Sequence, residues 1–284
     1  MIPASFDYAR ATSIEDAVAQ LSASNGGGKV IAGGHSLVPL MKLRLAQPSL
    51  LIDIARIPGL SGIREEGGTI DIGAATVHHD IATSSLLRER CPMLADAAAE
   101  IGDPQVRNRG TLGGSLAHAD PAADYPAAML ALDADIRVQG PRGARSVKAG
   151  EFFRDLFTVD LAADELIVGI RFAPVRSAAY AKLHQRASHF AIVGVAAALD
   201  IGGGVIRSAR LGLTGAVACA VRLTNVEQAL AGQPATTAAV TAAAAQAGSG
   251  LGAINGDLHA SAEYRQAMIP VFARRALEAA LKRG

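Results

Sequence analysis

Glycine clusters in two short motifs of this chain, and these motifs restrict the fold more than any other feature of the sequence. The first is Ala32-Gly33-Gly34-His35-Ser36, which begins at the last residue of a segment, 29–32, that is expected to be a short strand. The second is Thr111-Leu112-Gly113-Gly114-Ser115. Adjacent glycines permit positive φ angles and let another group approach the main chain without a Cβ in the way. Both motifs therefore predict tight turns that present main-chain N–H groups.

The two motifs share features that suit an anionic ligand. Successive N–H groups in such a turn form a concave anion site, and a nearby serine hydroxyl can donate to a phosphate oxygen. Neither motif matches the phosphate-binding pattern that ends in Gly-Lys-Ser/Thr, or the dinucleotide pattern G-x-G-x-x-G. Two such turns suit a ligand with two phosphates, and Asp120 and Asp124 suit its sugar or ribityl hydroxyl groups. The residues alone predict a nucleotide-like ligand; a pair of turns that bind nothing is the alternative.

Composition excludes several classes of protein. The chain has 284 residues, of which 50% are apolar and 19% charged, which excludes a disordered protein and allows a large core. With 27 Lys and Arg against 26 Asp and Glu, the net charge of +1 gives no support for nucleic-acid binding. No run of about 18 apolar residues is present, so we expect no transmembrane segment. Cys91 and Cys219, the two cysteines, provide no disulfide framework and no metal site, and we expect both to be inert thiols.

The first ten residues, MIPASFDYAR, lack the basic region and apolar stretch of a signal peptide. We therefore expect a cytoplasmic protein.

Hydrophobic patterning and turn residues predict a mixed α+β chain. A capping box of Thr12 and Glu15 opens the first helix, and Gly67-Gly68 turns a hairpin over residues 63–74. Further strands are expected at 29–32, 50–54, 136–139 and 166–172. Further helices are expected at 80–88, 93–101 and 126–132.

The last third of the chain reads as strands followed by helices, which is typical of an α+β domain. The strands are expected at 180–183, 192–201 and 205–213. The helices are expected at 226–230, 236–247 and 261–282. Pro270 lies inside the last of these helices, so we expect a kink or a break there.

Several other polar residues are weaker candidates for a site. The segment His78-His79-Asp80 contains metal-ligand types, but adjacent side chains point apart, so we expect a solvated helix start. His118 lies beside the second motif and is expected to be a polar loop residue. Arg107 and Arg109 can each meet a phosphate or a carboxylate, or form a surface salt bridge.

The wider context of both motifs resembles a known protein family. Residues 32–44, AGGHSLVPLMKLR, are similar to the first flavin loop in the medium subunit of carbon monoxide dehydrogenase-type enzymes. Residues 106–115 resemble the second flavin loop, and residues 120–124 its usual continuation. Residues 260–265 and 274–277 resemble the closing helix of that family. These medium subunits are the FAD subunits of molybdenum hydroxylases and are related to the flavin domain of xanthine dehydrogenase.

The resemblance implies an FAD-binding fold of the vanillyl-alcohol-oxidase (PCMH) type. That fold has two subdomains, which we expect at residues 1–56 and 57–176. A C-terminal domain of the CO dehydrogenase flavoprotein type, with antiparallel strands and then helices, is expected at 177–284. The FAD would lie between the two subdomains.

The resemblance also implies a set of site residues. Both motifs would wrap the diphosphate, Asp124 would lie near sugar or ribityl hydroxyls, and Lys182 would match a lysine near the flavin. Phe190 falls where some members place a tyrosine against the isoalloxazine ring; a core position is the alternative, because a strand starts two residues later. The expected cofactor-binding residues are Ala32, Gly33, Gly34, His35, Ser36, Leu37, Ile101, Thr111, Gly113, Gly114, Ser115, Asp120, Asp124, Leu166, Lys182 and Phe190.

The resemblance further implies how electrons enter and leave the chain. No Cys or His stands where a covalent flavin link would form, so the FAD is expected to be non-covalent. Two cysteines cannot hold [2Fe-2S] clusters, and no molybdopterin domain is present, so a small iron–sulfur subunit and a large molybdopterin subunit must supply them. The chain would then be the FAD subunit of a heterotrimer, passing electrons from the partner clusters to an external acceptor. No residue of this chain is expected to act as a general acid or base.

Two other functions remain open at this point. A stand-alone FAD-dependent oxidase would need its own substrate pocket and a base near the flavin, for which His118 and His189 are candidates. A non-enzymatic flavin-binding module would need only the two motifs. In the heterotrimer, the substrate site would lie in another chain, so this sequence does not specify the substrate.

Overall fold

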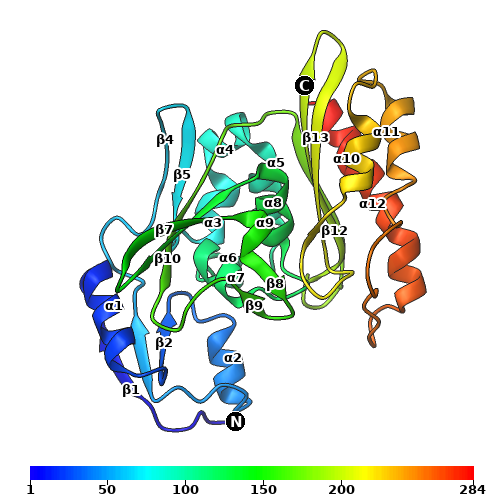
Figure 1. Cartoon of the computed structure of the whole chain (residues 1–284). Helices are drawn as coiled ribbons and strands as arrows, with labels where there is room; N and C mark the ends of the chain where they lie inside the picture. The colour runs from blue at the N-terminus through cyan, green and yellow to red at the C-terminus, as the bar shows by residue number, and fades with distance from the viewer.

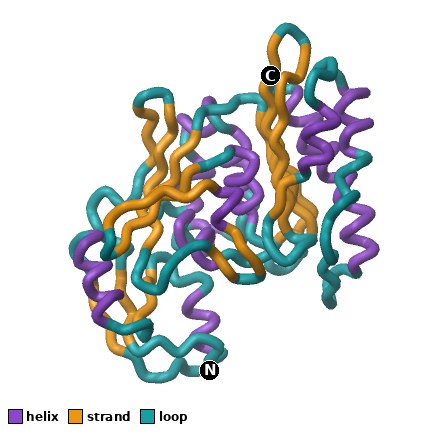
Figure 2. Tube along the Cα trace, in the orientation of Figure 1, coloured by secondary structure: helices purple, strands orange, loops and turns teal.

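The computed structural model describes residues 1–284 and arranges them in alternating layers of sheet and helix (Figures 1 and 2). A small N-terminal lobe adjoins a five-stranded sheet. A central layer of helices separates that sheet from a four-stranded sheet, and an outer layer of helices covers the far face of the latter. None of the helices combines the length and the apolarity that a membrane crossing requires.

The N-terminal lobe is a parallel sheet with strand order β1-β3-β2. Its elements are β1 (Asp7–Arg10), α1 (Ile14–Ala23), β2 (Gly28–Ile31), α2 (Leu37–Lys42) and β3 (Leu50–Asp53). The predicted capping box is displaced by one residue: the Ser13 hydroxyl, rather than that of Thr12, accepts the N–H of Asp16 at 3.1 Å. The Asp16 carboxylate accepts the N–H of Thr12 at 2.8 Å, so Asp16 takes the part expected of Glu15.

The five-stranded sheet is antiparallel throughout, with strand order β4-β5-β10-β6-β7. Its strands are β4 (Ile63–Glu66), β5 (Thr69–Gly73), β6 (Asp135–Gly140), β7 (Gly143–Lys148) and β10 (Leu166–Phe172). On one face, Ile70, Ile72 and Ile170 are fully buried. The hairpin of β4 and β5 and the whole of β10 lie where the sequence predicted them.

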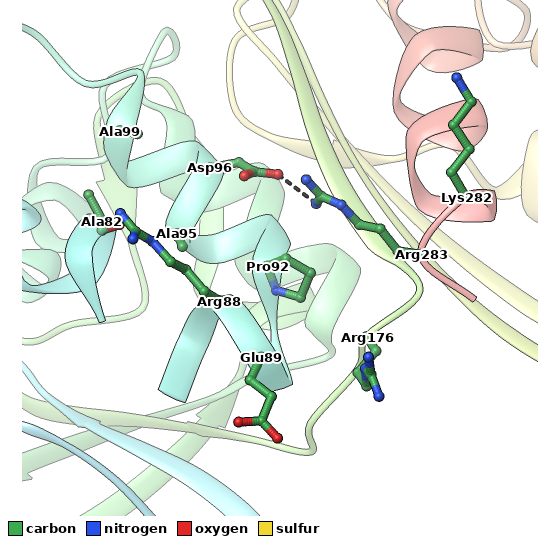
Figure 3. A pocket seen from close by; sticks show the side chains of 10 residues that line it. All are labelled: Ala82, Arg88, Glu89, Pro92, Ala95, Asp96, Ala99, Arg176, Lys282 and Arg283. Atoms are coloured by element: carbon green, nitrogen blue, oxygen red, sulfur yellow. Dashed lines mark hydrogen bonds and ion pairs between the residues drawn. The ribbon is translucent and has the colours of Figure 1, made fainter. Parts of the chain in front are cut away.

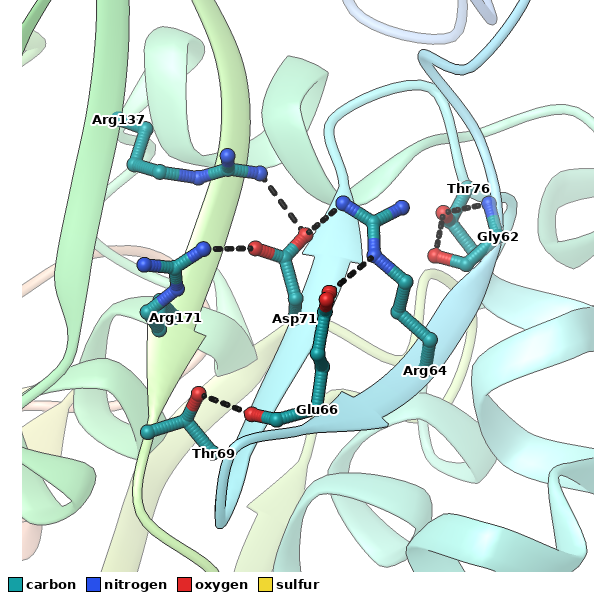
Figure 4. A network of polar contacts seen from close by, with 8 residues as sticks. All are labelled: Gly62, Arg64, Glu66, Thr69, Asp71, Thr76, Arg137 and Arg171. Carbon is teal, nitrogen blue, oxygen red and sulfur yellow. Dashed lines mark hydrogen bonds and ion pairs between the residues drawn. The ribbon is translucent and has the colours of Figure 1, made fainter.

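A charge cluster on the other face of this sheet joins four of its strands, β4, β5, β10 and β6 (Figure 4). The side chain of Asp71 is 3% exposed, and its carboxylate meets Arg137 at 2.8 Å, Arg171 at 3.1 Å and Arg64 at 3.2 Å. Arg64 and Arg171 stand directly opposite Asp71 in the register of β4 and β10. Because three cations converge on one buried carboxylate, the cluster stabilises this particular order of strands.

The central layer holds α3 (His78–Thr83), α4 (Ser85–Arg90), α5 (Pro92–Ala99) and α8 (Asp124–Leu132). The single helix predicted over 80–88 is two helices, because Ser84 leaves the helical region at ψ 118° and caps the second one. Every residue of α8 is buried, and this helix packs against β12 and β13 of the four-stranded sheet and against α5. A Cβ on Gly212 would collide with the carbonyl of Ala127, so α8 lies directly on the backbone of the four-stranded sheet.

The C-terminal sheet is antiparallel, with strand order β11-β12-β13-β14. Its strands are β11 (Ala178–His184), β12 (Ala191–Gly202), β13 (Val205–Thr214) and β14 (Val221–Arg222). The outer helices are α10 (Thr224–Leu230), α11 (Thr237–Ala244) and α12 (Ala262–Leu281). Of the kink or break predicted at Pro270, the break is wrong, because α12 is one continuous helix whose buried residues, including Ile269 and Phe272, pack against the sheet.

Short elements complete the chain, and the sequence did not predict them. They are α6 (Pro104–Arg107), α7 (Leu112–His118), α9 (Ala149–Phe152), β8 (Phe153–Asp155) and β9 (Thr158–Val159). Such pieces of two to seven residues carry too little periodicity to be recognised without their tertiary contacts.

Arg265 fastens α12 to the ends of β12 and β13. Its side chain is 4% exposed. One terminal nitrogen donates to the carbonyls of Ile192 and Gly215, at 2.7 and 2.9 Å, and the other donates to Asp257 at 2.6 Å. Removal of this guanidinium would leave two carbonyls and a carboxylate without their donor.

We predict that Arg265→Met lowers the free energy of unfolding by about 2–4 kcal/mol, because the carbonyls of Ile192 and Gly215 lose their donor. Arg274→Met, the same change at an exposed position of the same helix, should alter it by less than about 0.5 kcal/mol. Urea denaturation followed by circular dichroism measures both. Equal effects of the two changes would contradict a fastening role for Arg265.

Candidate functional site

One cavity of about 770 Å³ is lined by all of the predicted site residues except Lys182. They come from segments far apart in the sequence: the loop after β2, the turns around α6 and α7, the start of α8, β10, and the turn between β11 and β12. The fold therefore brings both glycine motifs to one place, as the sequence predicted.

The first motif presents unused hydrogen-bond donors. The main-chain N–H groups of residues 33–36 make no hydrogen bond within the chain. Gly34 has a φ of 73°, which a residue with a Cβ rarely adopts. The Ser36 hydroxyl does not cap α2, and the ring of His35 lies 3.0 Å from the carbonyl of Gly33. Free donors of this kind suit an anion, which is the ligand that the motif predicts.

The second motif is built differently, because all of its N–H groups except that of Thr111 donate to other groups of the protein. Those of Leu112 and Gly113 donate to the carbonyls of Thr76 and Ala74, at 3.0 and 2.8 Å. That of Gly114 donates to the Thr111 hydroxyl at 3.2 Å. This motif contributes shape and the Ser115 hydroxyl, rather than a second set of free N–H groups.

The glycines also differ in what they face. A Cβ on Gly33 would collide with the carbonyl of Arg109, and one on Gly113 would stand 2.6 Å from the Cβ of Ala74. Both are therefore required by packing of protein on protein. A Cβ on Gly114 would meet only the Thr111 hydroxyl, at 2.8 Å, and Gly114 is exposed at the cavity. Gly114 is thus the position where an added side chain would occupy ligand space.

Asp124 and Lys182 form a buried ion pair at the cavity wall. Lys182 reaches from β11 with a fully buried side chain, and its Nζ lies 2.8 Å from Oδ1 of Asp124. The same ammonium donates to the carbonyl of Glu100 at 2.8 Å, and the Tyr180 hydroxyl donates to Asp124 at 2.6 Å. Burial raises the pKa of the Asp124 carboxyl above its ordinary value, while Lys182 and Tyr180 oppose that rise. Lys182 therefore holds a wall residue and does not itself line the cavity.

Apolar residues and one turn make up other parts of the wall. Leu166 is 3% exposed on β10, and the partly buried Ile101 follows α5. The Asp120 carboxylate accepts the N–H of Ala122 at 2.8 Å, so it orders the turn that leads into α8.

Two aromatic rings stand at the rim. Phe190, in the turn between β11 and β12, is 48% exposed, and Phe157, in the turn between β8 and β9, is 51% exposed. A ring so exposed is not part of the core, so the core alternative for Phe190 is wrong. His118 lies against Phe157 with ring centroids 5.1 Å apart, and burial lowers its pKa.

The expectation of a solvated helix start at residues 78–80 is wrong for His78. This residue does begin α3, and His79 and Asp80 are exposed. His78 is only 5% exposed, however, because its ring points inward and lies 3.1 Å from the Tyr125 hydroxyl. Burial lowers its pKa to about 4, with further lowering from the charges of His35 and Arg107. The argument that adjacent side chains point apart holds for His78 and His79. It correctly predicted that His79 is exposed, but it did not predict that His78 is buried.

The two arginines before the second motif, Arg107 and Arg109, make their contacts with main-chain atoms. Arg107 donates to the carbonyls of Ile101 and Gly102, at 2.9 and 3.0 Å, instead of forming a salt bridge. Arg109 acts through its carbonyl, which packs against Gly33.

Burial raises the pKa of Cys91 to about 12, which keeps its thiol protonated. No three His, Cys, Asp or Glu residues lie together where they could hold a metal ion.

A second cavity, of about 560 Å³, contains none of the predicted site residues. It lies between α4, α5 and the end of α12, where Arg283 reaches across to Asp96 at 2.7 Å (Figure 3). Its lining is mostly polar and exposed, so it is a crevice between two parts of the fold.

Two family models together span the chain. Residues 4–175 match the FAD binding domain in molybdopterin dehydrogenase, and residues 178–280 match the CO dehydrogenase flavoprotein C-terminal domain. This chain belongs to the FAD-binding family of the molybdopterin dehydrogenases. The resemblance inferred from the two motifs is thereby confirmed.

Relatives of known function share the full length of this FAD-binding chain. The carbon monoxide dehydrogenase medium chain of Hydrogenophaga pseudoflava is 43% identical, covering 100% of this chain and 99% of the relative. The 6-hydroxypseudooxynicotine dehydrogenase complex subunit alpha of Paenarthrobacter nicotinovorans is 39% identical, covering 100% and 97%. The structure of the Hydrogenophaga pseudoflava enzyme lacking the Mo-pyranopterin moiety superposes with a TM-score of 0.95, covering 100% of this chain and 99% of that one.

These comparisons confirm several predictions at once. The fold class is α+β, with an FAD-binding part followed by a C-terminal domain of the flavoprotein type. The chain is a flavin subunit of the molybdenum-dependent dehydrogenases, and its class of enzyme is oxidoreductase.

We predict that Lys182→Met destabilises this flavoprotein by about 3 kcal/mol at pH 8, because Asp124 is left buried without its cation. The pKa of Asp124 should rise further above its ordinary value near 3.8. A folded-state pKa above the unfolded one means that stability falls as pH rises through that window. The variant should therefore lose less at pH 5 than at pH 8, as measured by urea denaturation.

The double variant Lys182→Met with Asp124→Asn is the control, because it removes both charges. Its loss of stability should not depend on pH between 5 and 8. A pH-independent loss in the single variant would show that the ion pair is not what stabilises this wall.

Proposed function

We propose that this chain holds FAD non-covalently in the 770 Å³ cavity and works in a complex with a small iron–sulfur subunit and a large molybdopterin subunit. Electrons from the [2Fe-2S] clusters of the partner would enter here and leave to an external acceptor. FAD supplies the chemistry that links one-electron and two-electron transfer. The residues of this chain bind and orient it.

The single observation that carries the proposal is the unused donor set of the first motif. The free N–H groups of residues 33–36 face one cavity together with Gly114, Ser115 and Asp124. An anionic diphosphate satisfies such donors, and a backbone without a Cβ at Gly114 leaves room for it. The cavity is also large enough for a dinucleotide-sized ligand. The donor set, the free space and the volume therefore all fit FAD.

The other site residues take distinct parts in this proposal. The hydroxyl groups of Ser36 and Ser115 assist the diphosphate, and Asp124 accepts from sugar or ribityl hydroxyls. Ile101 and Leu166 exclude water from the apolar side, and Phe190 covers the ring at the rim. Lys182 acts by holding Asp124, as their 2.8 Å contact supports.

We also propose the division into subdomains at 1–56 and 57–176 and a C-terminal domain at 177–284. In support, β1, β2 and β3 form a sheet of their own, and the two family matches meet between residues 175 and 178.

A cytoplasmic location is proposed as well, supported by two free cysteines, which suit a reducing compartment. Cell fractionation followed by immunoblotting tests the location.

We predict that acid releases FAD, and not FMN, from the purified chain or its complex, as identified by chromatography. Gly114→Val should abolish most flavin binding, because the new side chain fills ligand space. Gly150→Val is the matched control, since Gly150 also lies in a short helix and faces open space away from the cavity.

Recovery of FMN alone, or full FAD occupancy in Gly114→Val, would refute the proposed site. The isolated chain should also show no substrate turnover, because it holds no molybdenum site. Vigorous turnover by the isolated chain would favour a stand-alone oxidase instead.

We predict that Phe190→Ala weakens FAD binding by about 2- to 10-fold, because an aromatic contact contributes about 0.5–1.5 kcal/mol beyond its buried area. Phe190→Tyr should bind FAD about as well as the wild type. Since the ring is 48% exposed, neither change should shift the melting temperature of the flavin-free protein. Loss of stability without loss of affinity would assign the ring a structural role only.

A further inference from the structure

His78 occupies the place where the two glycine motifs meet. Its main-chain N–H donates to the carbonyl of Gly110 at 3.0 Å, directly before the second motif. Its ring lies beside Gly110, where an added Cβ would stand 2.5 Å from Nε2. His35 of the first motif is close enough to act on its charge. Neither the sequence nor the family match assigned this residue a role.

The tautomer of His78 follows from the hydrogen-bond inventory around Tyr125. The Tyr125 hydroxyl is fully buried, and Nδ1 of His78, at 3.1 Å, is its one side-chain or main-chain partner. Burial raises the pKa of Tyr125 well above its ordinary value, so the hydroxyl keeps its proton. A buried hydroxyl that fails to donate is costly, so it donates to Nδ1. The proton of the neutral imidazole must then be on Nε2.

The resulting Nε2–H group has no acceptor within the chain. His78 lines the cavity and is 5% exposed, yet Nε2 makes no hydrogen bond to any protein atom. A nearly buried donor without a partner needs a ligand atom or water. On this side of the cavity most main-chain donors of the second motif are already used, because Leu112, Gly113, Gly114 and Ser115 all donate internally and only the N–H of Thr111 does not.

We propose that Nε2–H of His78 donates a hydrogen bond to a diphosphate oxygen of FAD, and that Tyr125 is the positioning residue that fixes this tautomer. The inference rests on the proposed function. It adds a side-chain donor to a motif in which only the main-chain N–H of Thr111 is unused. Because His78 is neutral, with a pKa near 4, the donor persists unchanged from pH 6 to pH 9.

The test compares two amide substitutions in the full-length protein, stripped of flavin and titrated with FAD. His78→Gln can place an N–H at the position of Nε2, whereas His78→Asn reaches only the position of Nδ1. We expect the Asn variant to bind FAD about 10- to 100-fold more weakly than the Gln variant, as a hydrogen bond to a charged group requires. With riboflavin, which has no phosphate, the two variants should bind equally.

Tyr125→Phe tests the positioning role. It should weaken FAD binding in the wild-type background and have no further effect in the His78→Asn background. In ¹⁵N NMR spectra, His78 should be protonated on Nε2 in the wild type and show a mixture of tautomers in Tyr125→Phe. A structural role alone would leave the tautomer unchanged.

The outcomes separate this inference from the proposed function. If the wild type binds FAD and the Asn and Gln variants bind it equally, His78 does not donate to the diphosphate. The same conclusion follows if their ratio is as large with riboflavin as with FAD. If the wild type binds no FAD at all, the proposed function itself fails.

Discussion

The buried ion pair of Asp124 and Lys182 is the contact on which the rest of this structure depends. It joins the first residue of α8 to β11 and thus connects the FAD-binding part to the C-terminal sheet. Every residue of α8 is buried and the helix packs against β12 and β13, so the ion pair and this packing together hold α8 on the C-terminal sheet. Because Asp124 also lines the cavity, the same pair sets the geometry of the cofactor wall.

Two motifs of similar sequence perform different physical tasks in this fold. The first leaves the N–H groups of residues 33–36 free. In the second, the N–H groups of Leu112, Gly113 and Gly114 donate hydrogen bonds to Thr76, Ala74 and Thr111. Gly33 and Gly113 serve packing against neighbouring backbone, and Gly114 alone preserves space. In the proposed site, a diphosphate would therefore meet backbone donors from one side. From the other it would meet side chains, namely Ser115 and, by our inference, His78.

The sequence located the cavity because its two motifs are local patterns whose turns need little tertiary information. It predicted β10 to the residue and most of the C-terminal strands, since their apolar runs are long. It did not predict that the His78 ring points inward, because that orientation depends on a contact with Tyr125, 47 positions further along the chain. It also predicted a kink or a break at Pro270. The helix α12 does not break there, because the packing of its buried face compensates for the main-chain hydrogen bond that proline cannot donate. Burial and long-range pairing are the information that the local patterns lacked.

The order of the cavity segments along the chain has a consequence for biosynthesis. Both glycine motifs lie before residue 176, but Lys182 and Phe190 come later, on β11 and in the turn that follows it. A nascent chain that has emerged only as far as β10 thus offers an anion-binding turn, but it lacks the cation that steadies Asp124 and the ring at the rim. In the proposed site, stable capture of FAD would therefore require that the β11–β12 hairpin has left the ribosome, and cofactor loading would be a late event in the making of this protein.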